Sequence, residues 1–335
     1  MSRNIIKTII ISFVVLLCGS LFPTISKAQI NVNIPGALKN ELNMEIIPEY
    51  PRAYQNVYVN LSLYTDDLNS AYITWFNNGK VALEGTGKTS YAFRTGAPGE
   101  ETRIEVVVVL KNGVSFNRFF SVTPASVDLV WEADSYVAPF YAGKALHSKQ
   151  GSLKIVAFPE FYSKGKRIDS SNLIYSWYLN DEAIQSQSGY GKSSAVINGN
   201  LLGGTEKIYL LVRDPVTNIT AESYLDIQTV DPQVLFYKND PYYGRILEQS
   251  LANTYELKTT DLEIIATPFF MSQDGNNIQY DWKINGSTEP QLQGSRSAVF
   301  KKPDVNGSSL ISIDVTNPSK ILQLGQGKLQ IIFTK

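Results

Sequence analysis

Apolar and polar residues alternate along several short segments of the chain, and this alternation is the strongest structural signal in the sequence. The clearest segment is Ile278, Gln279, Tyr280, Asp281, Trp282, Lys283 and Ile284. A period of two is that of a β-strand with one buried and one solvent-facing side. Asn285-Gly286 follows, and Asn-Gly is typical of a type I′ hairpin turn because both turn positions need positive φ.

Three of the four tryptophans mark copies of one repeated unit. Trp75, Trp177 and Trp282 lie 102 and 105 residues apart. Each has an apolar or aromatic residue two positions before it and an asparagine three positions after it. That asparagine is followed by Gly79 or Gly286 in the first and third copies and by Asp181 in the second. We therefore expect a turn of another type in the second copy.

Further strand-like segments occur at matching places in the three copies. Each is a short run rich in apolar residues, and no convincing amphipathic helix interrupts them. Many short strands separated by turn residues are typical of β-sandwiches and barrels. The predicted strands cover residues 57–63, 104–110 and 116–122 in the first copy, 153–157, 208–212 and 221–227 in the second, and 262–266, 310–315 and 328–333 in the third.

The tryptophan hairpin with its Asn-Gly turn resembles the immunoglobulin-like superfamily in its cysteine-free bacterial forms, especially PKD-type and other surface Ig-like domains. This resemblance implies an all-β fold of three tandem Ig/PKD-like β-sandwich domains of about 100 residues each. We expect these domains at residues 29–123, 124–230 and 231–335. The whole chain is also similar to exported multi-domain proteins of small-genome bacteria, which sit among surface and pilus-type components.

Residues 1–28 have the three parts of a secretory signal peptide. Arg3 and Lys7 precede an apolar run, and Ser26 and Ala28 are small residues at positions −3 and −1 of a cleavage site. The uncharged stretch 8–26 is also close to the ~20 residues that span a bilayer, so an uncleaved membrane anchor stays open as the alternative. In either case we expect an extracytoplasmic protein, secreted or at the cell surface.

The chain has one cysteine, Cys18, and one histidine, His147, among its 335 residues. A Cys/His zinc site, a disulfide framework and a Cys–His catalytic pair all lack the residues they need. Cys18 lies in the apolar run, and Leu17 before it is too large for a lipoprotein signal. Cleavage after residue 28 would leave no cysteine, so core burial alone would stabilise the domains. We expect His147 to lie at the surface.

Thirty basic and 31 acidic residues give a net charge of −1, and neither half of the chain is strongly basic. This balance argues against a nucleic-acid partner. Loss of residues 1–28 removes Arg3, Lys7 and Lys27 but no acid, which leaves a net charge of −4. A negative mature chain argues against docking on acidic lipid. We expect membrane contact only through residues 1–28, if they are retained.

Two kinds of motif match catalytic or nucleotide-binding signatures only in part. Small polar clusters follow the tryptophans at residues 87–90, 191–194 and 294–297, but they lack the first glycine and the helix of a phosphate loop. They are therefore interpreted as loops before strands. Ser163 and Lys166 match Ser-x-x-Lys, yet the other elements of penicillin-binding enzymes are missing. Without an activated nucleophile or an acid–base pair, the sequence indicates a protein that is not an enzyme.

The acidic pairs Asp66-Asp67 and Glu100-Glu101 are the remaining candidates for a metal site. Adjacent acids in loops are usually just solvated, and no Asp-x-Asp-x-Asp loop occurs in the sequence. We expect no cofactor and no metal, with calcium at a domain junction as a minor hypothesis.

Two aromatic segments, residues 131–144 and 236–245, follow the predicted domain boundaries. Each contains proline, two adjacent aromatic residues and a glycine followed by a base. Such rings stack on sugars or peptides, or pack two domains together. Their position favours packing against the preceding domain. The candidates for ligand or inter-domain contact are Tyr136, Phe140, Tyr141, Tyr242 and Tyr243, and the residues expected in the cores are Trp75, Trp177 and Trp282.

Together these observations predict an exported, non-enzymatic structural and interaction protein of the cell surface or envelope. It would act as an adhesion or scaffold rod associated with pilus or secretion components. The expected partners are other envelope or surface proteins. The alternative is a carbohydrate-binding surface protein that contacts glycans through the junction aromatics, because β-sandwiches host many functions.

Overall fold

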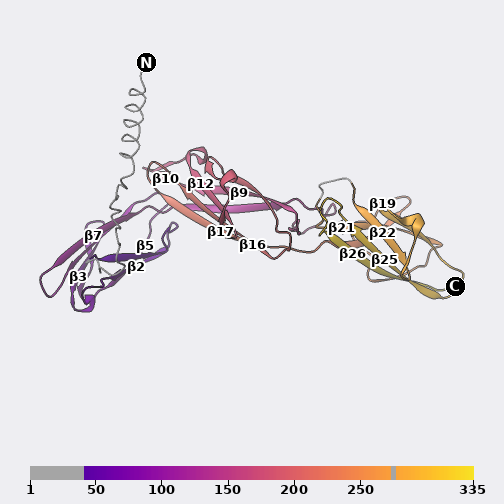
Figure 1. Cartoon of the computed structure of the whole chain (residues 1–335), viewed down its shortest axis with the longest axis horizontal. Helices are drawn as coiled ribbons and strands as arrows, with labels where there is room; N and C mark the ends of the chain where they lie inside the picture. Colours follow the sequence, from indigo (N-terminus) through magenta and orange to yellow (C-terminus); the bar gives the residue numbers. More distant parts are fainter. Residues whose placement is uncertain (1–40, 273–276) are drawn as a thin grey trace, which may run out of the picture. The chain divides into compact units, whose positions relative to one another are not determined.

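The computed structural model describes residues 41–272 and 277–335, and the predicted targeting segment lies outside them (Figure 1). The described chain is all-β, with three tandem β-sandwich domains of the Ig-like type, so the predicted fold class is confirmed. All nine predicted strand segments overlap observed strands. Within the described residues, no helix has the length and apolar character needed to cross a membrane.

The first domain packs two antiparallel sheets around a core between Leu42 and Val122. Its strands are β1 (Asn43–Ile47), β2 (Asn56–Ser62), β3 (Tyr72–Asn77), β4 (Lys80–Thr86), β5 (Ser90–Arg94), β6 (Thr102–Val109) and β7 (Ser115–Val122), with a 3-10 turn at Leu68–Ser70. The sheets have the orders β1-β2-β5 and β4-β3-β6-β7. On β6, Ile104, Val106 and Val108 are buried and alternate with more exposed residues, as period two requires.

The second domain repeats this arrangement around a core between Ala125 and Ile227. Its strands are β8 (Ser126–Ala133), β9 (Ser152–Glu160), β10 (Tyr162–Ser163), β11 (Lys166–Arg167), β12 (Ile174–Leu179), β13 (Glu182–Ala183), β14 (Gly189–Tyr190), β15 (Ser194–Asn198), β16 (Thr205–Arg213) and β17 (Thr220–Gln228), with 3-10 turns at Ser170–Asn172 and Gln185–Gln187. One sheet has the order β15-β9-β8, and the other is built on β13-β12-β16-β17.

The third domain folds as a nine-stranded sheet around a core between Val234 and Phe333. Its strands are β18 (Gln233–Asp240), β19 (Gly244–Arg245), β20 (Thr254–Glu256), β21 (Asp261–Phe269), β22 (Gln279–Ile284), β23 (Ser287–Thr288), β24 (Ser297–Lys301), β25 (Gly307–Thr316) and β26 (Leu324–Phe333), with a 3-10 turn at Pro290–Leu292. The main strand order is β23-β22-β25-β26-β18-β21-β24. The three cores are separate, while the exact domain limits near residues 124 and 231 stay a prediction.

The repeated tryptophan lies in the core of each sandwich and is hydrogen-bonded there through its only polar atom. Trp75, Trp177 and Trp282 are each 0% exposed. Their indole Nε1–H groups donate to main-chain carbonyls of the small polar clusters, namely those of Lys88 (2.8 Å), Lys192 (2.9 Å) and Ser295 (2.7 Å). An unpartnered buried N–H would cost ~1–3 kcal/mol, so these clusters have a structural task inside each domain.

The repeated asparagine ties each tryptophan hairpin to the next long strand. Its side-chain Oδ1 accepts a main-chain N–H across the sheet in all three copies: Asn78 from Arg103 (2.9 Å), Asn180 from Lys207 (3.0 Å) and Asn285 from Leu310 (2.8 Å). The expectation of another turn type at Asp181 is wrong, because Asp181 has a φ of 67° beside 78° for Gly79 and 84° for Gly286. Aspartate is one of the few non-glycine residues that tolerate this region.

Candidate functional site

Tyr136 and Tyr141 contact the third domain. The main chain of Tyr136 donates from its N–H to the Met271 carbonyl (2.8 Å) and accepts from the Phe270 N–H (2.7 Å). The Tyr141 ring meets Phe269 edge-on, with 5.3 Å between ring centroids. In the 131–144 segment the rings therefore pack on the following domain, and the expectation of packing on the preceding one is wrong for this segment. In the 236–245 segment, Tyr237 lies in a buried cluster with Ala138 of the preceding domain. The reason is that β8 carries the chain along the second domain to Ala133, so the rings that come after β8 lie beside the third domain.

Gln323, a fully buried residue between β25 and β26, links the second and third domains. Its Nε2 donates to Ser148 Oγ (3.0 Å) and the Lys149 carbonyl (2.7 Å) in the second domain. The same amide bonds Ser272 in the third domain, where Nε2 donates to Oγ (2.8 Å) and Oε1 accepts the main-chain N–H (2.9 Å). Leu322 adds a fifth bond, from its N–H to Gln150 Oε1 (2.8 Å). The junction thus has a buried polar centre around Gln323 and, separately, a small apolar cluster that contains Phe269 and Phe270.

The other three aromatic candidates are almost entirely in solvent. Phe140 is 95% exposed, Tyr242 92% and Tyr243 84%. The two tyrosines lie at the tip of the β18–β19 hairpin, where Asp240 Oδ1 accepts both of their main-chain N–H groups (3.0 and 3.3 Å). These hydrogen bonds lower the pKa of the Asp240 carboxyl. The hairpin tip is therefore a turn fixed by side-chain hydrogen bonds, and it exposes two aromatic rings to solvent. That these rings bind a ligand stays a prediction.

His147 is 0% exposed, so the expectation of a surface histidine is wrong. Among the residues that the structure describes, neither ring nitrogen has a hydrogen-bond partner, and Nε2 lies 4.0 Å from Glu206 Oε1. Burial lowers the pKa of His147, and the nearby Glu206 carboxylate partly opposes that shift. The burial of His147 could not be predicted, because the sequence around it is polar and turn-like. The room for its ring is left by Gly199, a distant residue where a Cβ atom would collide with the imidazole.

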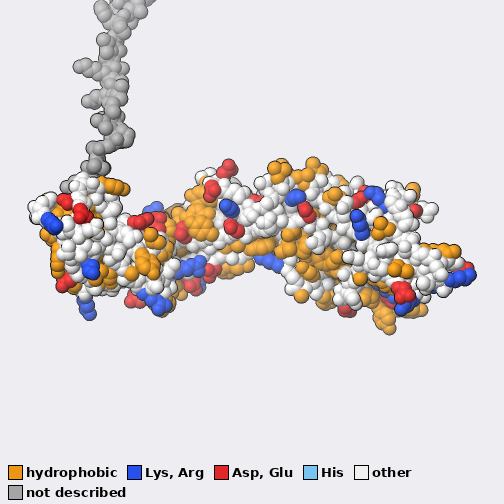
Figure 2. Space-filling model, turned by 90° about the horizontal axis from the view of Figure 1, so that it is seen from below, with side chains coloured by type: hydrophobic (Ala, Val, Ile, Leu, Met, Phe, Trp, Pro, Cys, Tyr) orange, Lys and Arg blue, Asp and Glu red, His pale blue; other side chains and the backbone are white. Residues whose placement is uncertain are grey.

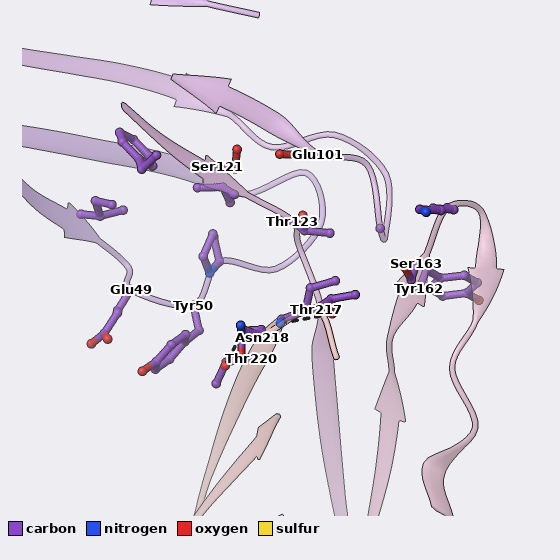
Figure 3. Close-up of a pocket in the computed structure, with 17 residues that line it drawn as sticks. Glu49, Tyr50, Glu101, Ser121, Thr123, Tyr162, Ser163, Thr217, Asn218 and Thr220 are labelled. Atoms are coloured by element: carbon purple, nitrogen blue, oxygen red, sulfur yellow. Dashed lines mark hydrogen bonds between the residues drawn. The ribbon is translucent and has the colours of Figure 1, made fainter. Parts of the chain in front are cut away.

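A cleft of about 500 Å³ opens between the first two domains (Figure 3). Five segments supply its labelled side chains: Glu49 and Tyr50 after β1, Glu101 before β6, Ser121 and Thr123 around the end of β7, Tyr162 and Ser163 on β10, and Thr217, Asn218 and Thr220 at the β16–β17 turn. The first domain also contacts the second through Arg52, whose guanidinium lies 3.1 Å from Asp128 Oδ1. This volume falls within the ~300–1,000 Å³ typical of small-molecule sites.

Three tyrosines form a row across the solvent-facing side of the second domain. Tyr178 pairs with Tyr209, and Tyr209 with Tyr224, on neighbouring strands β12, β16 and β17. Their ring centroids are 5.4 and 4.7 Å apart. The Glu222 carboxylate accepts hydrogen bonds from Tyr209 (3.1 Å) and Tyr224 (3.2 Å). Sequence reasoning missed this row, because each strand shows only its own tyrosine and strand register is not readable from it.

Charge and metal-binding groups are dispersed. On the face in Figure 2, basic and acidic side chains are interspersed among apolar patches. Within residues 41–272 and 277–335, no group of three or more His, Cys, Asp or Glu side chains is placed to hold a metal ion. The acidic pairs take part in local structure instead, since Asp67 Oδ1 accepts the Asn69 N–H (2.9 Å) and Glu100 Oε2 accepts the Ala97 N–H (3.0 Å).

Comparison with known proteins shows a likeness of fold. No family model and no curated protein matches the sequence. Among solved structures, the fibronectin(III)-like modules of Clostridium thermocellum CbhA match at 13% identity over 56% of this chain and 94% of theirs, with a TM-score of 0.26. The central fibronectin-III array of RIM-binding protein matches at 13% identity over 87% and 96%, with a TM-score of 0.31. Bacteroides ovatus SGBP-B, solved with a mixed-linkage heptasaccharide, matches at 13% identity over 87% and 70%, with a TM-score of 0.21.

Proposed function

We propose that this chain is an exported, non-enzymatic interaction protein of the cell surface or envelope, in which tandem domains act as an adhesion or scaffold rod. The observation that carries the proposal is the junction centred on Gln323, where a buried amide makes four hydrogen bonds to both domains. Buried polar networks of this kind rigidify the groups they join. Linked domains present their loops and sheet edges in a fixed relation, which suits contact with large partners.

The test combines export with partner capture in the native cells. We expect an intact mass that begins at Gln29, or a membrane-bound form that retains residues 1–28, with cross-links to envelope or surface proteins in both cases. The first result indicates a released or assembled surface component, and the second an anchored one. Recovery of the full-length chain in the cytosol, cross-linked only to cytosolic proteins, would contradict the proposal.

The second candidate function is carbohydrate binding, and the exposure of Phe140, Tyr242 and Tyr243 favours it. Large aromatic rings that stay in solvent have apolar faces free to stack on sugars. The test is a glycan array with the wild type and with Tyr242→Ala and Tyr243→Ala, and Tyr64→Ala as the matched control, since Tyr64 is 70% exposed on the first domain. Binding that is lost in the hairpin variants alone supports this candidate. Turnover of any glycan would overturn the non-enzymatic assignment.

A further inference from the structure

We infer that the cleft between the first two domains, continued by the tyrosine row of the second domain, binds a neutral oligosaccharide. This rests on the carbohydrate-binding candidate but assigns the ligand to residues far in sequence from the exposed aromatics. Of the cleft residues, the sequence drew attention only to Glu101, as half of an acidic pair, and to Ser163, as part of a Ser-x-x-Lys match, and to neither as a sugar contact.

The cleft offers both kinds of contact that a sugar needs. Sugars have apolar C–H faces, which stack on rings, and rims of hydroxyl groups, which both donate and accept hydrogen bonds. Tyr50 and Tyr162 supply rings from opposite domains, and Ser121, Thr123 and Thr220 supply hydroxyl groups between them. Because donors and acceptors are both present, the lining matches a polyhydroxyl ligand better than a purely apolar one.

Carboxylates supply the strongest acceptors of the cleft. Glu49 and Glu101 line it, and neither forms an ion pair among the described residues. A carboxylate accepts hydrogen bonds at two oxygens, which fits neighbouring hydroxyl groups on one sugar, and bonds to a charged acceptor are the stronger kind. Lys164 is the single basic residue of the lining. The excess of acid disfavours uronates and sulfated glycans, so the ligand is neutral.

The surface next to the cleft offers the same kinds of group, namely a carboxylate and a tyrosine ring. Thr220 lines the cleft, and Glu222 and Tyr224 follow on the same face of β17 at every second position. Tyr224 is 67% exposed, and because β17 is the edge of its sheet, no further strand pairs beyond that ring. An oligosaccharide that is longer than the cleft can therefore extend over Tyr224, while a disaccharide is held by the cleft alone.

The tyrosines keep their hydroxyl protons over the physiological pH range. A hydrogen bond to Glu49 and burial raise the pKa of Tyr50 to about 12. Burial and the Glu222 carboxylate raise the pKa values of Tyr209 and Tyr224 as well. These groups therefore remain neutral donors, and binding should not change between pH 6 and pH 9 through their titration.

The experiment titrates the full protein with neutral oligosaccharides chosen from a glycan array, as matched two-unit and six-unit chains, and with a uronate-containing chain. We expect Tyr50→Ala and Glu101→Gln to weaken both neutral ligands at least tenfold. Tyr224→Ala should weaken only the six-unit chain. Tyr64→Ala and Tyr243→Ala are controls that should stay within twofold of the wild type, and the melting temperature of each variant checks that it is folded.

Several results would overturn this inference. Loss of binding in Tyr242→Ala and Tyr243→Ala, with Tyr50→Ala unchanged, would place sugar recognition at the exposed hairpin and keep the carbohydrate-binding candidate. Tighter binding of the uronate chain would contradict the charge argument. A lack of binding to any glycan, or capture of a protein partner at the cleft, would refute glycan binding. None of these results would decide whether the protein is exported and cross-linked to the envelope.

Discussion

The side-chain amide of Gln323 and the hydroxyl of Ser148 are joined by a 3.0 Å hydrogen bond in which both side chains are buried and belong to different domains. Replacement Gln323→Leu keeps the approximate volume but leaves the hydroxyl groups of Ser148 and Ser272 and the Lys149 carbonyl without this partner. Each unpartnered buried group costs ~1–3 kcal/mol. We expect a loss of at least ~2 kcal/mol in the free energy of unfolding, measured with urea.

Gln326→Leu is the matched control for that variant. Gln326 lies three residues further along and is exposed, and its side-chain Nε2 donates to Asp314 Oδ1 (2.7 Å) within the third domain. Surface substitutions of this kind usually change stability by ~0.5 kcal/mol or less. Equal losses for the two variants would show that the Gln323 bonds do not stabilise the junction.

The repeat and its strands could be predicted from sequence, because alternation and turn residues are local signals. The period of two at residues 278–284 needs no knowledge of distant strands to identify β22. The contacts between domains could not be predicted, because they join residues that are far apart in the sequence. Gln323 and Ser148 are 175 residues apart, and a single glutamine between Leu322 and Leu324 carries no local sign that it is buried against another domain.

The tryptophans test the role of the small polar clusters. Trp177→Ala should cost ~3–5 kcal/mol, because it empties a fully buried site and leaves the Lys192 carbonyl without the indole donor. Urea unfolding followed by circular dichroism measures this loss. Lys192→Ala keeps that carbonyl and removes only an exposed side chain, so its stability should stay within ~0.5 kcal/mol of the wild type. A loss under about 1 kcal/mol for Trp177→Ala would refute the repeat register.

In the tryptophan hairpin of the second domain, the backbone at Asp181 is strained, and a substitution to glycine can remove that strain. Asp181 has a φ of 67°, where the other two copies have glycine. We expect Asp181→Gly to raise the free energy of unfolding by up to ~1 kcal/mol, because glycine enters this region at no steric cost. Gly286→Asp, at the matching position of the third domain, should lower it. The prediction fails if both substitutions shift the urea midpoint in the same direction.

A chelator tests the calcium hypothesis directly. The acidic loops are held by hydrogen bonds to main-chain N–H groups, so we expect the melting temperature of the purified protein to change by less than a degree or so in excess EDTA. Calorimetry with added calcium is the reverse measurement. A large drop with EDTA that calcium restores would instead establish a stabilising metal site.

The buried histidine makes stability depend on pH in a defined direction. Burial holds the pKa of His147 below its ordinary value of 6.5, while the unfolded chain titrates near that value. Below pH 6.5 the unfolded state therefore binds more protons than the folded state, and stability falls as pH falls through this window. Glu206 is the charged group that faces the ring, 4.0 Å away, and it reduces the effect without reversing it. We expect the free energy of unfolding to drop between pH 7 and pH 5.5 by up to ~1.4 kcal/mol per pH unit.

The variant His147→Leu distinguishes the contribution of His147 to the pH dependence of stability from the contributions of the other titrating groups. Leucine is apolar and lacks the two unpartnered ring nitrogens, so the variant should lose the pH dependence in this window while the carboxylates still titrate at lower pH. Because Ser148, Lys149 and Gln150 follow directly and hold the third domain, acid should loosen the junction in the wild type before it unfolds either core. Limited proteolysis at pH 5.5 would then cut near residue 147 in the wild type and not in the variant. Identical pH slopes for the two proteins would show that His147 is not the titrating group.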